Sequence, residues 1–418
     1  MAQFKLIICS CLICYLCNNI ISQAQNVPVY LYFASHNETN DITYHGLDYA
    51  DAADYATMRG YVKQVCDTIM AYNARYEMML ESNFILGCLQ NESAHTNPDD
   101  LIEWADNTAQ IEIQPHNHFK PFGFGANPYN YADLCHLLDS CGLSSTSEVM
   151  GGFIWRNFTS PPVNQDWTQW QTPQPGFTFP FYSWKPTLLW GGGSPNHIDD
   201  YDAYGIWKPQ AATIAGFGIH NPTGALVNFG SGCSEDFILW DTTNVALLAN
   251  RILNFADSVN LHFAGNANAF FCMKVMMNFR NFPSPGYAAK VGQLIRLIQP
   301  DVCNGVLHWQ GIMETYTQWL AAHPNPNDYY LSRCENTVAI SNAPNTATYT
   351  ITLNGPDSVC ANTPQTYTVN NPAAGSTYIW TITGNYTIVS GCGSNNSSCT
   401  LQWTGGTAGT VSVTQSTL

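Results

Sequence analysis

The sequence predicts an α/β protein in which an irregular (β/α) barrel is followed by a small all-β, immunoglobulin-like sandwich. Short apolar or β-branched runs alternate with helical stretches from residue 27 to about residue 324, and roughly seven such β/α units favour a barrel. After about Cys334 the composition shifts to Thr, Ser and Gly, and strands with a period of two residues follow one another. For the first part, an open doubly wound sheet is the alternative.

Residues 1–24 have the pattern of a signal peptide. Lys5 supplies the positive start, Leu6 to Cys17 form a mostly apolar run, and Ser22-Gln23-Ala24 fits a cleavage site with small residues. The run is too short to span a bilayer, and no later stretch is long and apolar enough for a membrane helix. The sequence therefore predicts a secreted or cell-surface protein without membrane insertion.

The barrel is predicted to cover residues 27–330. Its expected strands are, in order, Val27–Ala34, Tyr76–Leu80, Ile111–Pro115, Val149–Trp155, Ala225–Phe229, Ala269–Met277 and Val302–His308. Its expected helices are Tyr49–Asn73, Tyr131–Cys141, Ala288–Ile298 and Gly311–Ala322. The stretch from residue 157 to residue 202 is rich in Pro, Gly and Trp and predicts a long surface loop. No Gly-rich phosphate loop follows any strand, which argues against a nucleotide cofactor.

Polar residues close two of these strands. The first strand runs into His36-Asn37-Glu38, and the third runs into His116-Asn117-His118. Residues two apart on a strand project from the same face, so each pair would point one way. If the two strands are parallel neighbours, their four polar side chains converge and supply the N/O ligands that a catalytic metal needs. The plainer alternative is a pair of ordinary polar strand ends.

Each candidate residue is assigned a role on this hypothesis. The metal ligands are His36, His116 and His118, and zinc is the expected divalent ion. Glu38 is the first candidate for the general base if it is not itself a ligand, and Glu81, after the second strand, is the alternative; His308, at the last strand end, is the candidate acid for the leaving group. For Glu81 and His308, an ordinary polar strand end is an equal alternative.

The charge and aromatic content of the chain limit the classes of ligand that it is expected to bind. The chain has 14 Lys and Arg against 30 Asp and Glu, a formal charge of −16, which argues against nucleic acid. Aromatic residues make up 13% and charged residues 11%, a composition that suits a secreted glycan-binding protein. Trp155, Trp190 and Trp207 are the candidate sugar-stacking residues, with core packing as the alternative for some of them.

Four of the 15 cysteines lie in the predicted signal peptide, which leaves 11 in the mature chain. In an exported protein they are expected to form disulfides, although their connectivity cannot be read from sequence. The plausible bridges are Cys66/Cys88, Cys135/Cys141, and Cys360 with Cys392 or Cys399. No CxxC occurs in the mature chain, which makes a cysteine zinc site unfavourable.

A linker over residues 331–348 precedes the predicted sandwich, residues 349–418. Gly355-Pro356-Asp357-Ser358-Val359-Cys360-Ala361, Tyr378-Ile379-Trp380-Thr381-Ile382 and Leu401-Gln402-Trp403 resemble the PKD-like modules of secreted bacterial proteins. The resemblance implies a spacer or binding module and the type IX secretion machinery as a partner. Because no sorting tail is visible and Leu418 ends a strand pattern, we expect the chain to be a fragment of a longer protein.

The order of motifs in the first part resembles the polysaccharide-deacetylase (NodB-homology) superfamily. The strand ending in His/Glu, the strand closing in His-x-His and the strand with Gly151-Gly152 carry the likeness over residues 27–324. Members of that family have an Asp-Asp pair after the first strand and more widely spaced histidines. The resemblance therefore transfers metal ligation to His116 and His118, and an acidic position to Glu38, but no catalytic aspartate.

Three functions follow. The first is a secreted, metal-dependent carbohydrate esterase or related hydrolase acting on acetylated glycan, as the resemblance implies. The second is a metal-free glycoside hydrolase with paired carboxylates, Glu38 and Glu81. The third is a catalytically inactive barrel that binds glycan at the cell surface.

Overall fold

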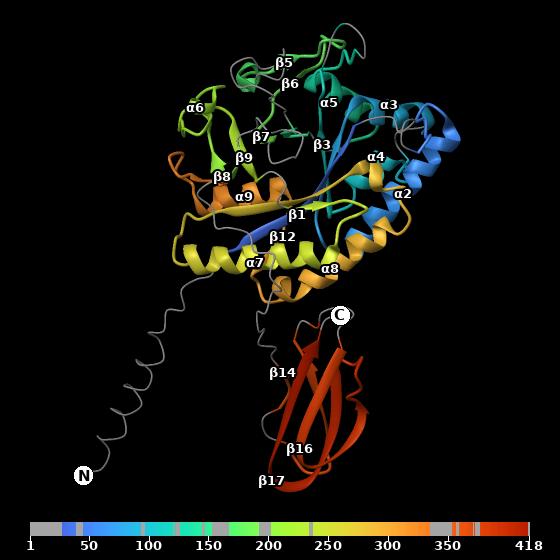
Figure 1. The fold of residues 1–418 in the computed structure, drawn as a ribbon, viewed down its shortest axis with the longest axis vertical. Coiled ribbons are helices and arrows are strands. Elements are labelled where there is room, and N and C mark those ends of the chain that lie inside the picture. The colour runs from blue at the N-terminus through green and yellow to red at the C-terminus, as the bar shows by residue number, and fades with distance from the viewer. Residues whose placement is uncertain are drawn as a thin grey trace, which may run out of the picture.

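The structure is a computed structural model that describes residues 27–38, 45–92, 97–119, 122, 126–143, 147–152, 167–191, 202–233, 237–334, 353–356, 359–370, 372 and 377–416. The predicted signal peptide therefore lies outside the described residues. The first part of the chain is a mixed α/β fold with a parallel sheet, and the last part is a separate group of antiparallel strands (Figure 1).

A six-stranded parallel sheet forms the centre of the first part. Its strands are β1 (Val29–Asn37), β2 (Tyr76–Leu80), β3 (Ile111–Pro115), β10 (Ile238–Leu239), β11 (Phe271–Met277) and β12 (Leu307–Trp309). Their order is β10-β11-β1-β2-β3, and β12 pairs with the first half of β1. All nine residues of β1 are buried or nearly so, because this strand lies in the middle of the sheet.

Helices cover one face of this sheet (Figure 1). They are α2 (Ala52–Ala71), α3 (Ser82–Asn91), α4 (Leu101–Asp106), α5 (Tyr131–Ser140), α7 (Val245–Phe263) and α8 (Tyr287–Cys303). Alternate residues of β1, namely Val29, Leu31 and Phe33, pack into the core that these helices share with the sheet. The helix α2 begins after Asp51, whose carboxylate accepts the N–H groups of Ala53 and Asp54.

A second sheet covers the other face. It has the order β13-β8-β9-β7-β4. Its strands are β4 (Val149–Gly151), β7 (Leu188–Gly191), β8 (Ala203–Trp207), β9 (Val227–Gly232) and β13 (Tyr330–Arg333). The intervening β1 residues Tyr30, Tyr32 and Ala34 pack against this sheet, in a core that also takes in Trp190 and Phe229. An isolated parallel bridge between His116 and Gly151 connects the two sheets.

The remaining elements of the first part are short, apart from one helix. They are η1 (Trp167–Gln171), β5 (Gln174–Pro175), β6 (Ser183–Trp184), α6 (Ile214–Phe217), η2 (Phe279–Asn281) and α9 (Ile312–Ala322). Two carboxylates, one buried and one half-buried, hold the first turn of α9. Glu77 of β2 accepts the N–H of Ile312 (2.7 Å), and Glu112 of β3 accepts the N–H of Met313 (3.1 Å). Carboxylates are favoured there because the first N–H groups of a helix have no partner within it.

Several sequence expectations need correction. The stretch expected to be one long loop contains β7, which is buried in the second sheet, and the helix α7 was not foreseen. The last strand was expected over Val302–His308, but Val302 and Cys303 belong to α8 and the strand begins at Leu307. The described strands form two bridged sheets, so a closed barrel is not established.

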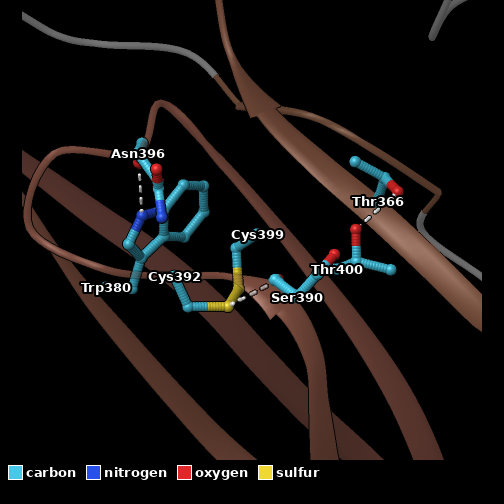
Figure 2. Close-up of a disulfide and its surroundings, with 7 residues drawn as sticks. All are labelled: Thr366, Trp380, Ser390, Cys392, Asn396, Cys399 and Thr400. Carbon is cyan, nitrogen blue, oxygen red and sulfur yellow. Dashed lines mark hydrogen bonds between the residues drawn. A yellow bond between two sulfur atoms is a disulfide. The ribbon is translucent and has the colours of Figure 1, made fainter.

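The last part of the chain contains a four-stranded antiparallel sheet in the order β14-β15-β17-β16. Its strands are β14 (Leu353–Asn354), β15 (Pro364–Val369), β16 (Thr377–Gly391) and β17 (Ser398–Ser416). A disulfide between Cys392 and Cys399 closes the β16–β17 hairpin, next to the Trp380 indole, which donates to the Asn396 carbonyl (Figure 2). The predicted sandwich is not established, because the described strands of this part make one sheet.

Cysteine pairing differs from the expected bridges. The disulfides between described cysteines are Cys233–Cys334 and Cys392–Cys399. The cysteines of the first two expected pairs, Cys66 with Cys88 and Cys135 with Cys141, are buried free thiols, and Cys360 is an exposed one. Sequence spacing could not reveal this, since pairing depends on which Cα atoms the fold brings within about 7 Å.

Among the described helices, none has the length and apolar content needed to cross a bilayer.

Candidate metal centre

Strand register brings the polar strand ends to one edge of the parallel sheet. His36 pairs with Met79 of β2, and Met79 in turn pairs with Gln114 of β3. Two residues further along, the same register sets Glu38, Glu81 and His116 side by side on three neighbouring strands. The N–H of Glu81 donates to the Asn37 carbonyl and that of His116 to the Leu80 carbonyl, so both strand pairings continue to this level.

At this edge, three imidazoles surround one carboxylate oxygen. Oε1 of Glu38 lies 3.3 Å from His36 Nδ1, 3.3 Å from His116 Nε2 and 3.7 Å from His118 Nε2. The Nε2 atoms of His116 and His118 are 2.9 Å apart, and the rings of His36 and His116 stack with centroids 4.0 Å apart. The donor atoms of His36, Glu38 and His116 lie within 4.8 Å of one another, a grouping that could hold a metal ion. The two strand ends therefore meet, although β2 lies between β1 and β3, which are not the direct neighbours that the prediction assumed. The predicted ligand His118 is not part of this grouping of three.

The protonation states of His116 and Glu38 favour the binding of a metal cation between them. Burial, together with the neighbouring His36, lowers the pKa of His116 to about 3, so its ring is neutral at pH 7. Its Nδ1 lies 3.2 Å from the Gly151 carbonyl, which can only accept; in the tautomer that donates to this carbonyl, Nε2 is free to present a lone pair to a metal ion beside Glu38. Burial alone would raise the pKa of Glu38, but the three imidazoles outweigh it and hold that pKa well below its usual range. A neutral imidazole and a carboxylate thus converge their lone pairs, as metal ligands do.

Gly152 forms the wall of the site opposite the carboxylate. Its φ is +56°, and a Cβ atom there would lie 2.5 Å from His116 Nδ1 and 2.9 Å from His36 Nε2. Glycine tolerates this left-handed conformation and leaves the space that the two rings occupy. Gly152, noted in the sequence only within the Gly151-Gly152 motif, therefore leaves the space that both rings occupy.

Glu81 borders the cluster as a second carboxylate with a different charge state. Burial, opposed by His118 and reinforced by the negative charge of Glu38, raises the pKa of Glu81 to about 7. The Asn127 side-chain amide donates to its Oε1 (2.9 Å) and that of Asn83 to its Oε2 (3.4 Å). A carboxyl group that titrates near neutral pH and is held by two amides is suited to proton transfer.

The expected roles change for Glu38 and His308. Glu38 was the first candidate for the base, but its oxygen lies among the imidazole nitrogens, in a ligand position. His308 pairs with Tyr30, six residues before His36 on β1, so it lies on the order of 20 Å from the cluster at about 3.3 Å per residue. Its Nε2 bonds to the Gly305 carbonyl (3.0 Å). The assignment of His308 as the acid of this site is therefore wrong.

The predicted tryptophan platform is not found in the described residues. Trp190 and Trp207 are each 1% exposed, and Trp155 lies outside the described residues. Trp190 makes a T-shaped contact with His36, with ring centroids 5.8 Å apart, and its indole donates to the Tyr32 hydroxyl. Neither buried ring can stack on a sugar in this conformation.

Two exposed phenylalanines lie near the residue that follows the His-x-His motif. Phe122 is 76% exposed and Phe177 is 46% exposed, and Phe177 contacts both Phe122 and Phe119, the residue after His118. Buried Asp133 accepts the N–H groups of residues 177–179 and so holds Phe177 in place. In the sequence, the signal for this group of phenylalanines was the position of Phe119 and Phe122 shortly after the His-x-His motif.

Solved structures similar to this chain share little sequence with it. A protein from Parabacteroides distasonis, provisionally described as a glycoside hydrolase/deacetylase, is 7% identical over 86% of this chain and 80% of its own, with a TM-score of 0.43. The allantoinase PuuE is 11% identical over 71% and 91%, with a TM-score of 0.38. A 4-alpha-glucanotransferase from Thermococcus litoralis is 9% identical over 64% of this chain, which spans 36% of that protein, with a TM-score of 0.34. Likeness at this level says nothing about activity.

The end of the chain matches a known family by sequence. No curated protein matches the chain as a whole. A family model described as PKD-like domain matches residues 344–417, which include the four-stranded sheet with the Cys392–Cys399 disulfide. The resemblance inferred from the sequence is thus confirmed, and the C-terminal part of this chain is a PKD-like domain.

Proposed function

We propose that the first part of the chain is a metal-dependent hydrolase that removes acetyl groups from a glycan outside the cell. The observation that carries the proposal is the convergence of Glu38 Oε1 with the Nε2 lone pair of neutral His116, 3.3 Å apart. Two further imidazoles at the same carboxylate complete an N/O donor set typical of zinc sites.

His36, Glu38 and His116 would hold the ion, with His118 next to them at the more exposed side. When bound, a divalent ion in such a site lowers the pKa of water and polarises an acyl oxygen. The Gly151 carbonyl orients the His116 ring through Nδ1, which is the usual outer contact of a ligating histidine. Gly152 excludes any side chain from the space beside both rings.

Glu81 is the group that moves protons in this proposal. With a pKa of about 7 it can accept the proton of an attacking water and return it to the leaving sugar hydroxyl. Asn127 and Asn83 hold the two carboxyl oxygens in place while the proton moves. Glu38, engaged by three imidazoles, is unsuited to that task because its pKa is held far below neutral pH.

An extended, weakly polar substrate is favoured by the surface beside His118. Phe122 and Phe177 are exposed there, and apolar rings in water favour the C–H faces of a polysaccharide over a small charged ester. The formal charge of −16 argues for a neutral or cationic glycan. The PKD-like domain and the disulfides accord with an extracellular location.

The proposal is tested by metal content and acetate release on the same samples. Elemental analysis of the purified chain is expected to find about one divalent ion, and chelation is expected to abolish acetate release from acetylated xylan and chitin oligosaccharides. His116→Ala should lose both ion and activity, whereas His262→Ala, an exposed histidine on α7, should keep both. Acetate release that survives chelation and His116→Ala would refute the proposal.

A metal-free glycoside hydrolase is the second candidate. The observation that favours it is the separation of two carboxyl pKa values, one far below and one near neutral pH, which is the pattern of a nucleophile with an acid. In that case new reducing ends, not acetate, appear from the glycan, and chelators have no effect. Absence of metal and of both products would leave the third function, glycan binding alone.

A further inference from the structure

A surface pocket of about 380 Å³ lies between β10 and the first two turns of α7. β10 is the outermost strand on its side of the six-stranded sheet, and Leu239, its last residue, pairs with Met277 of β11. Met277 in turn pairs with Ser35, the residue before His36. At about 4.8 Å between neighbouring strands, β10 is on the order of 10 Å from β1. The pocket therefore lies at the same edge of the sheet as the candidate metal centre.

Part of the pocket lining is apolar. It includes Ile238 of β10, the half-buried ring of Trp240, and Leu247 and Leu248 of α7. Leu248 belongs to the core, whereas Leu247 is 41% exposed. Ligand pockets generally combine such a lining with a few polar groups that orient the ligand. The apolar part is suited to the body of a ring-sized organic ligand.

Arg251 is the charged residue of the lining. It is half-buried, and within the part of the chain that the structure describes its guanidinium group has no hydrogen-bond or ion-pair partner. The chain has 30 acidic residues against 14 basic ones, and the half-buried Arg59 and Arg75 both pair with glutamates. A guanidinium group that is partly withdrawn from water and left unpaired favours an oxyanion, which it can bind through two parallel hydrogen bonds.

The other polar side chains of the pocket also offer donors. The Asn244 side-chain oxygen already accepts the Leu247 N–H (3.1 Å), which leaves its NH₂ group as a donor. The Thr243 hydroxyl is engaged on both sides, because it accepts the Trp240 N–H (2.8 Å) and donates to the Ile238 carbonyl (3.2 Å). The Trp240 indole N–H is a further donor. A ligand group that only accepts hydrogen bonds therefore matches this lining.

Two other ligand classes fit less well. A cation would face the charge of Arg251 with no carboxylate in the lining, and a neutral ligand would leave the guanidinium charge unpaired. Next to the lining, Lys290 donates to the carbonyls of Asp241 and Thr243, and the charges of Lys290 and Asp241 offset each other. We infer that this pocket is an anion site that binds one carboxylate or sulfate group carried on a ring-sized body. The formal charge of −16 opposes a polyanion, so a single acidic group is favoured.

The proposed function suggests what carries this acidic group. If the metal centre deacetylates a glycan, the ligand is an acidic sugar unit, such as a uronate, of an otherwise neutral chain that contacts both sites at the same edge of the sheet. This identification rests on the proposed function, whereas the anion site rests on the pocket alone.

The experiment measures binding by the full chain with named probes. Titration calorimetry and saturation-transfer NMR would use D-glucuronate, D-glucose 6-sulfate and benzoate as anions, with D-glucose and D-glucosamine as the neutral and cationic counterparts. At least one anion is expected to bind more tightly than both counterparts, and raising the salt concentration from about 0.01 M to about 1 M should weaken that binding. A preference for D-glucuronate or the sulfate over benzoate supports the acidic sugar, and the reverse preference overturns it.

Variants of Arg251 locate the binding. Arg251→Gln removes the charge and is expected to weaken anion binding about tenfold or more, whereas Arg251→Lys keeps the charge and should retain part of the affinity. Lys185→Gln, which removes an exposed positive charge between β6 and β7, is the matched control and should bind as the parent does.

His116→Ala separates this inference from the proposed function. It should abolish acetate release and leave anion binding unchanged, so that either proposal can fail alone. The anion site is overturned if none of the three anions binds, if D-glucose or D-glucosamine binds as tightly, or if Arg251→Gln binds the anions as the parent does.

Discussion

At the residue scale, two glutamates of the candidate site differ in charge state and are therefore suited to different roles. Glu38 and Glu81 follow neighbouring strands, yet their surroundings are opposite: three imidazoles face Glu38, whereas Glu81 is buried among amides with a like charge nearby. The first stays ionised and suits a ligand, and the second titrates near neutral pH and suits a proton carrier. Sequence spacing alone could not assign these roles, because both residues are strand-end glutamates.

Glu81→Gln is expected to lower kcat by about 10²- to 10⁴-fold, since the amide cannot carry a proton. Because the pKa of Glu81 is about 7 and the ionised carboxylate is the base, the rate of acetate release by the parent should rise as pH increases through about 7. This rise should be absent from the pH profile of the variant. Acetate release measured from pH 5 to pH 9 checks this. Glu314→Gln, at a half-exposed salt bridge with Arg75, is the matched control. A retained limb near pH 7 in Glu81→Gln would contradict the assignment.

At the element scale, the end of β4 matters as much as the two histidine strands. Gly151 receives the His116 Nδ1–H, and Gly152 lies against the rings of both His36 and His116. The β3–β4 link is a single bridge, reinforced by Gln114, whose Oε1 accepts the N–H of Val149 (3.1 Å). The candidate site therefore sits at the junction of the two sheets.

Gly152→Ala is expected to reduce metal content and activity strongly, because its Cβ would overlap His116 and His36. Left-handed strain alone would cost only about 1–2 kcal/mol. Gly265→Ala, with a φ of +82° and no atom within 4 Å, separates strain from overlap. Elemental analysis and thermal unfolding of both variants check the prediction. Equal metal content in the two variants would show that the overlap is relieved.

The helix α9 is anchored by a carboxyl pair whose ionisation couples folding to pH. Burial, followed by the charge of Glu112, raises the pKa of Glu77 well above 4.5, so above that pH the folded protein holds a proton over a range in which the unfolded chain has lost it. A raised carboxyl pKa stabilises the fold below about pH 4.5, and that stabilisation falls as pH rises towards the folded-state pKa. The slope is about 1.4 kcal/mol per pH unit for one proton.

Glu77→Gln is expected to flatten this dependence, because the amide donates to Glu112 without titrating and still accepts the Ile312 N–H. Glu81, with its own raised pKa, should keep part of the slope. Urea unfolding of parent and variant from pH 5 to pH 8 measures it, with Asp67→Asn on α2 as the exposed control. An unchanged slope in Glu77→Gln would mean that the pair does not share a proton in the fold.

At the scale of the whole molecule, the Cys233–Cys334 disulfide joins the end of β9 to the end of β13 across 101 residues of sequence. The enclosed segment contains α7, β11, α8 and α9 and returns the chain to the second sheet through β13, which pairs with β8. A crosslink over such a long loop restricts the unfolded chain strongly.

Cys233→Ser with Cys334→Ser is expected to lower the free energy of unfolding by about 2–5 kcal/mol. Thermal or urea unfolding with and without reductant measures the effect. In the double variant the reductant can act only on Cys392–Cys399, so it should lower the stability much less than in the parent. Cys303→Ser, at a partly buried free thiol, is the control and should change stability far less. A double variant as stable as the parent would contradict the role of this crosslink.

The sequence by itself determined several of the elements and the faces on which the site residues lie. The bounds of β2 and β3 were predicted correctly, and the period of two placed His36 with Glu38, and His116 with His118. The PKD-like part was also recognisable from its residues. These features are local, because strand periodicity and short motifs depend on neighbours along the chain.

Only the tertiary structure decided which strand ends share the site. β12 pairs with the first half of β1, so His308 lies far from the candidate site. Packing of the second sheet buries Trp190 and Trp207. The tertiary structure also places Glu38 in the position of a ligand, not of a base, and it sets Gly152 against the rings of His36 and His116. Register between strands and packing between sheets are long-range, and the burial that shifts a pKa arises from contacts between residues far apart in sequence.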